Sequence, residues 1–103
     1  MNKRDFLPIH PGEILQEEFL IPMGISQHQL ALGMRVAQQK INDIVRGRRS
    51  ITPQTALRLA IALGTTAEFW ISLQAEYDLE CAKGLFGEKI SLDVARLNEK
   101  RID

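Results

Sequence analysis

The stretch SQHQLALGMRVAQQKINDIVRG, residues 26–47, contains two short amphipathic patterns separated by only a few residues. In the first, apolar residues recur at helical spacing: Leu30, Ala31 and Met34. Ser26 precedes them, and Gln29 follows Ser26 at the third position. This pair predicts a capping box, in which the serine oxygen accepts from a free backbone N–H and the glutamine side chain reaches back. We therefore expect a helix over about residues 26–34.

The second pattern, over about residues 38–46, combines a thin apolar stripe with a polar face of unusual composition. The stripe consists of Ile41, Ile44 and Val45. The opposite face carries amides and a guanidinium group: Gln38, Gln39, Asn42 and Arg46. Such groups form paired hydrogen bonds with base edges in the major groove of DNA. Two tightly joined helices, the second of them so equipped, predict a helix-turn-helix.

The net charge of the 103-residue chain is zero, which taken alone argues against a nucleic-acid partner. The distribution of charge reverses that argument. Residues 35–58 hold six basic residues and one acidic residue (+5), whereas residues 1–34 and 59–103 carry −2 and −3. Basic charge is therefore concentrated at the predicted DNA-binding surface, as phosphate binding requires. A merely solvated charged surface is the alternative interpretation.

The composition is that of an ordinary globular domain, with 45% hydrophobic and 25% charged residues. No apolar run approaches the roughly 20 residues that span a membrane. The first ten residues, MNKRDFLPIH, contain no apolar segment long enough for a signal peptide. Cys81 is the single cysteine, which excludes an internal disulfide and favours a reducing, cytoplasmic location.

The sequence predicts three parts: an N-terminal arm (residues 1–10), a helix-turn-helix domain (11–82) and a C-terminal extension (83–103). Pro22 is expected to stop the first helix of the domain. Thr52 and Pro53 are expected to open the fourth helix as N-cap and first helical residue. That helix is apolar almost all round, which predicts a central buried position.

The last predicted helix of the domain, over about residues 66–81, opens with a second capping box formed by Thr65 and Glu68. Gly84 and Gly87 are expected to break it, and a further short helix is expected from Ser91 on. The helix carries more large apolar side chains than one face can bury. This surplus predicts a homodimer interface formed by Trp70, Leu73 and Tyr77. Coverage of the same surface by residues 85–103 of the chain itself is the alternative.

Three motifs that follow one another along about residues 7–80 carry a family resemblance: HPGEIL…EEFL…P, LA…V…I..I..GRR.IT and A.RLA..LGTT..FW..LQ..YDL. Together they resemble the HigA-type addiction-module antitoxins, a lambda-repressor-like (Xre) helix-turn-helix family that includes virulence-associated protein I. The resemblance implies an all-α, five-helix DNA-binding domain whose third helix enters the major groove. It also implies a homodimer that represses its own operon, and a small ribonuclease toxin that is neutralised by binding.

Two residues depart from the family's pattern. Arg35 stands in the turn between the two helices, where glycine is usual because the turn often needs a positive φ; arginine there costs roughly a kcal/mol or takes a different turn. Ala37 replaces the serine or threonine that normally caps the next helix, which weakens that cap by about 1 kcal/mol. Both changes affect the exact placement of the third helix.

The polar residues of this region are assigned two roles. Base reading is predicted for the amides, which can pair with adenine through two hydrogen bonds: Gln38, Gln39 and Asn42. Phosphate binding is predicted for Ser26, Gln27, Lys40, Arg46, Arg48 and Arg49. A solvated helix surface is the alternative for each amide. The expected partner is a palindromic operator in double-stranded DNA.

Catalysis has little support in the sequence, so we expect no enzyme. His10, His28 and Cys81 are isolated from one another, which gives no metal site, and no cofactor is expected because no glycine-rich phosphate loop is present. Two classes of function compete. The first is an operator-binding repressor, either paired with a toxin or acting as an orphan regulator. The second is a protein-interaction module on the same scaffold, because a fold does not fix a function.

Overall fold

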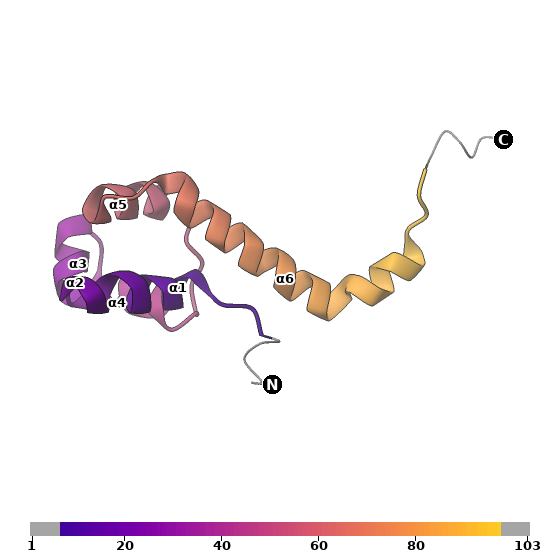
Figure 1. The fold of residues 1–103 in the computed structure, drawn as a ribbon, viewed down its shortest axis with the longest axis horizontal. Coiled ribbons are helices and arrows are strands. Elements are labelled where there is room, and N and C mark those ends of the chain that lie inside the picture. Colours follow the sequence, from indigo (N-terminus) through magenta and orange to yellow (C-terminus); the bar gives the residue numbers. More distant parts are fainter. Residues whose placement is uncertain (1–6, 98–103) are drawn as a thin grey trace.

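The computed structural model describes residues 7–97, and over that range the chain is built from helices without strands (Figure 1). Residues 1–6 of the predicted arm and residues 98–103 of the predicted extension lie outside the described residues. The elements are α1 (Pro11–Ile14), η2 (Leu15–Leu20), α2 (Ile21–Met23), α3 (Gln27–Met34), α4 (Gln38–Val45), α5 (Pro53–Leu63) and α6 (Ala67–Asp93). Because α1, η2 and α2 follow one another without a gap, they form one helix, and the five-helix, all-α prediction is confirmed for the described range.

The first helix does not stop at Pro22, as the sequence predicted, but runs on to Met23. Its middle section, η2, is a π-helical segment, and the Ile21 N–H donates to the carbonyl of Gln16, five residues back. Proline disturbs a helix mainly because it lacks an N–H and crowds the preceding turn. In this helix the turn just before the proline is a π turn rather than an α turn. Gly24 then ends the helix.

The helix-turn-helix is formed by α3 and α4, which pack against each other. The predicted capping box is present: Ser26 Oγ accepts from the Gln29 N–H at 3.0 Å, and Gln29 Oε1 accepts from the Ser26 N–H at 2.8 Å. Arg35 ends α3 with φ 59° and ψ 47°, so this arginine adopts the left-handed conformation that glycine usually supplies. As expected, Ala37 gives α4 no side-chain cap.

The fourth helix, α5, opens as predicted, with Thr52 Oγ1 accepting from the Thr55 N–H and Pro53 in the first turn. It is not buried all round, however. One face enters the core, whereas Leu57 is 58% and Ile61 86% exposed. In a domain this small the other helices cover only one side of α5, so apolar residues on its other side remain exposed.

The core gathers side chains from all five helices and the loop before α5: Leu15, Leu20, Leu30, Ala31, Met34, Ile41, Ile44, Ile51, Ala56, Leu59, Leu63 and Trp70. Trp70 is completely buried, and its ring centroid lies 5.2 Å from that of Phe19. Its indole N–H donates to Thr65 Oγ1 at 2.7 Å. The predicted capping box of Thr65 and Glu68 is therefore wrong, since Thr66 caps α6 by accepting from the Phe69 N–H.

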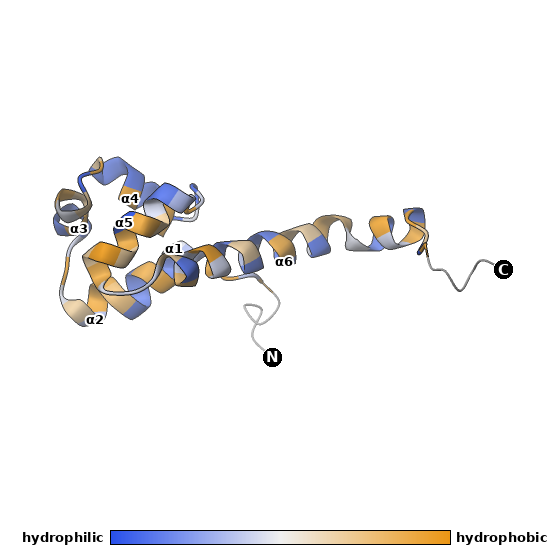
Figure 2. Cartoon of the chain, turned by 90° about the horizontal axis from the view of Figure 1, so that it is seen from above, coloured by the Kyte–Doolittle hydropathy of each residue, from blue (hydrophilic) through white to orange (hydrophobic). Residues whose placement is uncertain are grey.

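The last helix is much longer than the sequence predicted. Gly84 and Gly87 lie inside α6, which continues to Asp93, and residues 94–97 form no further helix. The helix changes direction in its second half, in the region of these glycines (Figure 1). Only its first half packs on the domain, and the second half projects away from it with apolar residues along its length (Figure 2). The described part of the extension therefore does not fold back over the domain.

Candidate nucleic-acid interface

The polar face of α4 points away from the core, because Ile41 and Ile44 on its opposite side are fully buried. The amide side chains of Gln38 and Gln39 are exposed, and that of Asn42 is half-buried. This arrangement is the outward-facing row of hydrogen-bonding groups that the sequence predicted for α4. Gly12 helps to hold the helix in place: its backbone packs so closely on Ile44 that an added Cβ would collide with the Ile44 carbonyl oxygen.

Two residues at the start of α3 contact the polar face of α4. The Nδ1 atom of His28 lies 3.1 Å from Oε1 of Gln38. The side-chain amide of Asn42 donates to Oε1 of Gln27 at 3.2 Å. These hydrogen bonds bring the N-terminus of α3 and the face of α4 into a single polar surface.

A third interaction lies within α4 and extends to the following loop. The Gln39 amide nitrogen donates to Oδ1 of Asp43 at 2.8 Å, and Nη2 of Arg49 lies 3.6 Å from Oδ2 of the same carboxylate. The Arg48 N–H donates to the Asp43 carbonyl at 2.8 Å. Asp43, the one acidic residue of the basic region, thus connects α4 with the two arginines of the loop.

The basic side chains lie around this surface. Arg46, Arg48 and Arg49 are exposed at the end of α4 and in the loop, and Lys40 is half-buried. The Ser26 backbone N–H is taken by Gln29, and its hydroxyl oxygen accepts from the Gln29 N–H, so the hydroxyl hydrogen is the donor that Ser26 can offer to a phosphate. Arg58, which was counted in the basic region, instead donates to the Met34 carbonyl at 2.8 Å and so closes the C-terminus of α3.

Comparison with known proteins agrees with this geometry. A family model described as helix-turn-helix matches residues 16–70. Virulence-associated protein I of Dichelobacter nodosus is 49% identical over 82 residues, which cover 80% of this chain and 76% of that protein. The solved structure of antitoxin GraA in complex with its operator matches with a TM-score of 0.84 and 47% identity, covering 88% of this chain and 92% of that one. Pseudomonas aeruginosa antitoxin HigA with the higBA promoter matches with a TM-score of 0.85 and 43% identity, covering 88% and 99%.

The chain belongs to the HigA-type helix-turn-helix family. The resemblance of the sequence motifs is thereby confirmed.

The loop after α4 of this HigA-type chain is held by residues that the sequence reasoning missed. Gln74 is buried in α6, where its Oε1 accepts from the Ile51 N–H at 2.8 Å and its amide nitrogen donates to Asp78 at 3.0 Å. A glutamine four residues after Trp70, on the stripe that faces the core, is the signal that could have identified it.

His10 supports the same loop from the N-terminal side. Its Nδ1 accepts from the Gly12 N–H at 2.8 Å, and its ring lies against Gly47, whose φ of 76° forms the turn after α4. The ring also makes an edge contact with Tyr77, with centroids 4.8 Å apart. Burial lowers the pKa of His10, an effect that the nearby Asp78 carboxylate partly opposes.

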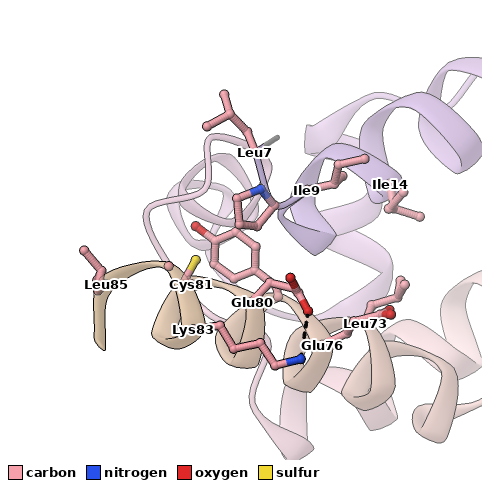
Figure 3. A pocket seen from close by; sticks show the side chains of 12 residues that line it. Leu7, Ile9, Ile14, Leu73, Glu76, Glu80, Cys81, Lys83 and Leu85 are labelled. Carbon is pink, nitrogen blue, oxygen red and sulfur yellow. Dashed lines mark hydrogen bonds and ion pairs between the residues drawn. The ribbon is translucent and has the colours of Figure 1, made fainter. Parts of the chain in front are cut away.

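The structure corrects one part of the predicted dimer interface. Trp70 is 0% exposed within the protomer, so its side chain offers no surface to a second copy. Leu73 and Tyr77 are half-buried and line an apolar groove of about 980 Å³ between residues 7–9 and α6 (Figure 3). Their role in an interface stays a prediction.

The described residues, 7–97, contain no cluster of three or more His, Cys, Asp or Glu side chains arranged to hold a metal ion. In the same range no helix is both long enough and apolar enough to cross a membrane.

Proposed function

We propose that this HigA-type chain is a sequence-specific DNA-binding repressor that autoregulates its operon and neutralises a ribonuclease toxin as its antitoxin. The observation that carries the DNA-binding part is the exposed amide face of α4 beside a loop of arginines. Two relatives support the proposal, since they were solved with an operator or a promoter and are named antitoxins. The protein-interaction module, the competing function, makes no use of this surface.

In this proposal α4 lies in the major groove, and its three amides read bases: Gln38, Gln39 and Asn42. Amide side chains suit adenine, which presents an acceptor at N7 and a donor at N6. The phosphates are bound by Arg46, Arg48, Arg49 and Lys40, with the start of α3 at Ser26 and Gln27 adding a partially positive helix end. The loop arginines set the register, and the amides supply the sequence preference.

We further propose that the operator is a palindrome read by a homodimer built on the projecting half of α6. Leu79, Phe86 and Ile90 are about half exposed and, with Ala82, lie along one side of this helix. Two copies packed antiparallel about residue 84 place Ala82 opposite Phe86 of the second copy and Leu79 within one residue of Ile90. The same register brings Asp78 near Lys89 of the second copy. Large side chains thus meet small ones and a negative side chain meets a positive one, so this side of α6 is complementary to a second copy of itself.

The DNA-binding proposal is tested with duplexes selected by the wild-type protein from a randomised library. Asn42→Ala should weaken binding to the selected duplex by roughly 1–3 kcal/mol and change binding to unselected duplex little. Equal weakening on both duplexes would remove Asn42 from the base readers. Failure of the library to enrich any sequence would overturn the proposed function itself.

The antitoxin part depends on a partner protein. We propose that the toxin is encoded next to this chain and is bound in the cytoplasm. The acidic excess of residues 59–103 suits a basic ribonuclease. Co-expression of the adjacent reading frame should yield a stable complex and restore growth. Without a complex or rescue, the chain is an orphan regulator.

A further inference from the structure

We infer that Asp43 determines specificity by positioning Gln39, although Asp43 itself reads no base. The inference rests on the proposed function, in which the amide of Gln39 meets a base edge. Asp43 is the one acidic residue among the six basic residues of the stretch 35–58. Near DNA phosphates a carboxylate opposes binding to every sequence. A carboxylate at position 43 therefore needs a role other than increasing the affinity for DNA.

The carboxylate of Asp43 uses each of its oxygens for a different purpose. Oδ1 accepts from the Gln39 amide nitrogen at 2.8 Å, and Oδ2 lies 3.6 Å from Nη2 of Arg49. The Asp43 side chain is only 19% exposed, whereas that of Arg49 is 50% exposed. Arg49 thus partly neutralises the carboxylate and holds it beside Gln39, while remaining accessible to a phosphate.

The chemistry of this hydrogen bond fixes the orientation of the Gln39 amide. An ionised carboxylate only accepts hydrogen bonds, so the NH₂ group of Gln39 must face Asp43. Its Oε1 and its second N–H then remain for DNA, as an acceptor beside a donor. That edge matches N6–H and N7 of adenine. With the amide turned over, the acceptor and the donor would exchange places and the match would be lost.

The other two amides of α4 are not held in this way. Gln38 contacts the imidazole of His28, and Asn42 contacts the amide of Gln27. Imidazole and amide groups both donate and accept, so either partner pair can form with the amide in either orientation. Gln39 is therefore the amide of this face with one defined donor–acceptor edge, and Asp43 is the reason.

The test replaces Asp43 by asparagine, which has the same shape but can donate as well as accept. Binding is measured on the duplex selected by the wild-type protein and on all of its single base-pair variants. Gln39→Ala first identifies the base pair that Gln39 reads. At that position the ratio of affinities for the preferred and the substituted base pair should be about two- to tenfold smaller for the Asp43→Asn variant than for the wild type. Binding to unselected duplex should become tighter or stay unchanged, because one negative charge has been removed.

Two controls separate positioning from charge and from folding. Glu88→Gln removes one negative charge from the exposed, projecting half of α6 and should leave the base preference intact. In the double variant of Asp43→Asn with Gln39→Ala, the preference at the Gln39 base pair should be no weaker than with Gln39→Ala alone. Thermal unfolding of each variant reports its stability.

The outcomes are distinguishable. A preference unchanged in Asp43→Asn would overturn the inference while leaving the proposed function in place. Parallel tightening on all duplexes would reduce Asp43 to an electrostatic effect, and parallel weakening with a lower melting temperature would reduce it to a structural one; both overturn the inference. A wild-type protein without sequence preference would overturn the inference and the proposed function together.

Discussion

Arg35 and His10 show how single residues set the geometry of the helix-turn-helix. Arg35 accepts a left-handed backbone at the end of α3, and the neighbouring Met34 carbonyl is closed by Arg58. His10 caps the start of α1 and lies against Gly47, in the turn that leads into the loop with the two arginines. A residue far from the amide face in sequence thus supports the surface proposed to bind DNA.

The pH dependence of stability should contain a contribution from His10. Burial lowers its pKa in the folded protein below the unfolded value of 6.5. The neutral imidazole, whose Nδ1 caps Gly12, is then favoured by folding. Its contribution is complete above pH 6.5 and is lost as the pH falls through the lower, folded pKa.

Urea unfolding of the wild type and of His10→Asn at several pH values between 5 and 8 measures this effect. Asparagine is a good N-cap that does not titrate in this range, so the variant should lose stability less steeply on acidification. His28→Asn, at an exposed position, serves as the control. Equal slopes for the wild type and His10→Asn would contradict the assignment.

At the scale of the helices, two glycines of very different surroundings illustrate what packing decides. Gly12 lies in α1 with its backbone against the carbonyl of Ile44. Apart from the adjacent residues and backbone of α6 itself, no atom lies within 4 Å of the position that a Cβ on Gly84 would take. Gly12 allows α1 to approach α4 closely. Gly84 makes no such packing contact, and its only effect is to lower the helix propensity of α6.

Alanine should therefore have opposite effects at these two positions. Gly84→Ala should stabilise α6 by up to about 1 kcal/mol, since alanine favours a helix interior. Gly12→Ala should destabilise the domain by several times that amount, because α1 and α4 would have to separate. Thermal unfolding followed by circular dichroism compares the two variants. Similar small effects at both positions would show that the close approach at Gly12 does not hold.

The projecting half of α6 allows a matched test of the proposed dimer. Phe86 lies with Leu79 and Ile90 on the side of α6 that is proposed to bind the second copy. Its neighbour Leu85 lines the groove of Figure 3. Phe86→Asp should convert the dimer into a monomer in sedimentation equilibrium, and Leu85→Asp should leave it dimeric. Dissociation by Leu85→Asp alone would assign the interface to the groove side, with Leu73 and Tyr77.

At the scale of the whole molecule, charge and apolar surface are separated. Basic residues gather at α4 and its loop, whereas the exposed apolar residues of α6 extend away from the domain. A neutral chain can therefore present a positive surface to DNA and keep a different surface for protein partners. The contacts of each protomer with DNA phosphates should depend on the first of these surfaces alone.

Removing one loop arginine tests this separation. Arg48→Ala should weaken binding to selected and unselected duplex alike. It should also reduce the slope of log affinity against log salt concentration by about one for each protomer, and so by about two for the dimer. Lys83→Ala, on α6, should change neither quantity. A loss confined to the selected duplex would mean that Arg48 reads a base.

The sequence alone determined where most helices begin and which residues face outward on α4. The reason is that caps and helical faces depend on residues three or four positions apart, as in the capping box of Ser26 and the Thr52–Pro53 start of α5. Pro22 in the first helix and Gly84 and Gly87 in α6 carry local helix penalties, which the two helices tolerate at positions outside the core. The tertiary structure alone decided the burial of Trp70. It also decided the contacts that hold the loop after α4, such as Gln74 with Ile51. These features depend on which distant segments pack together, and a local sequence pattern does not determine that packing.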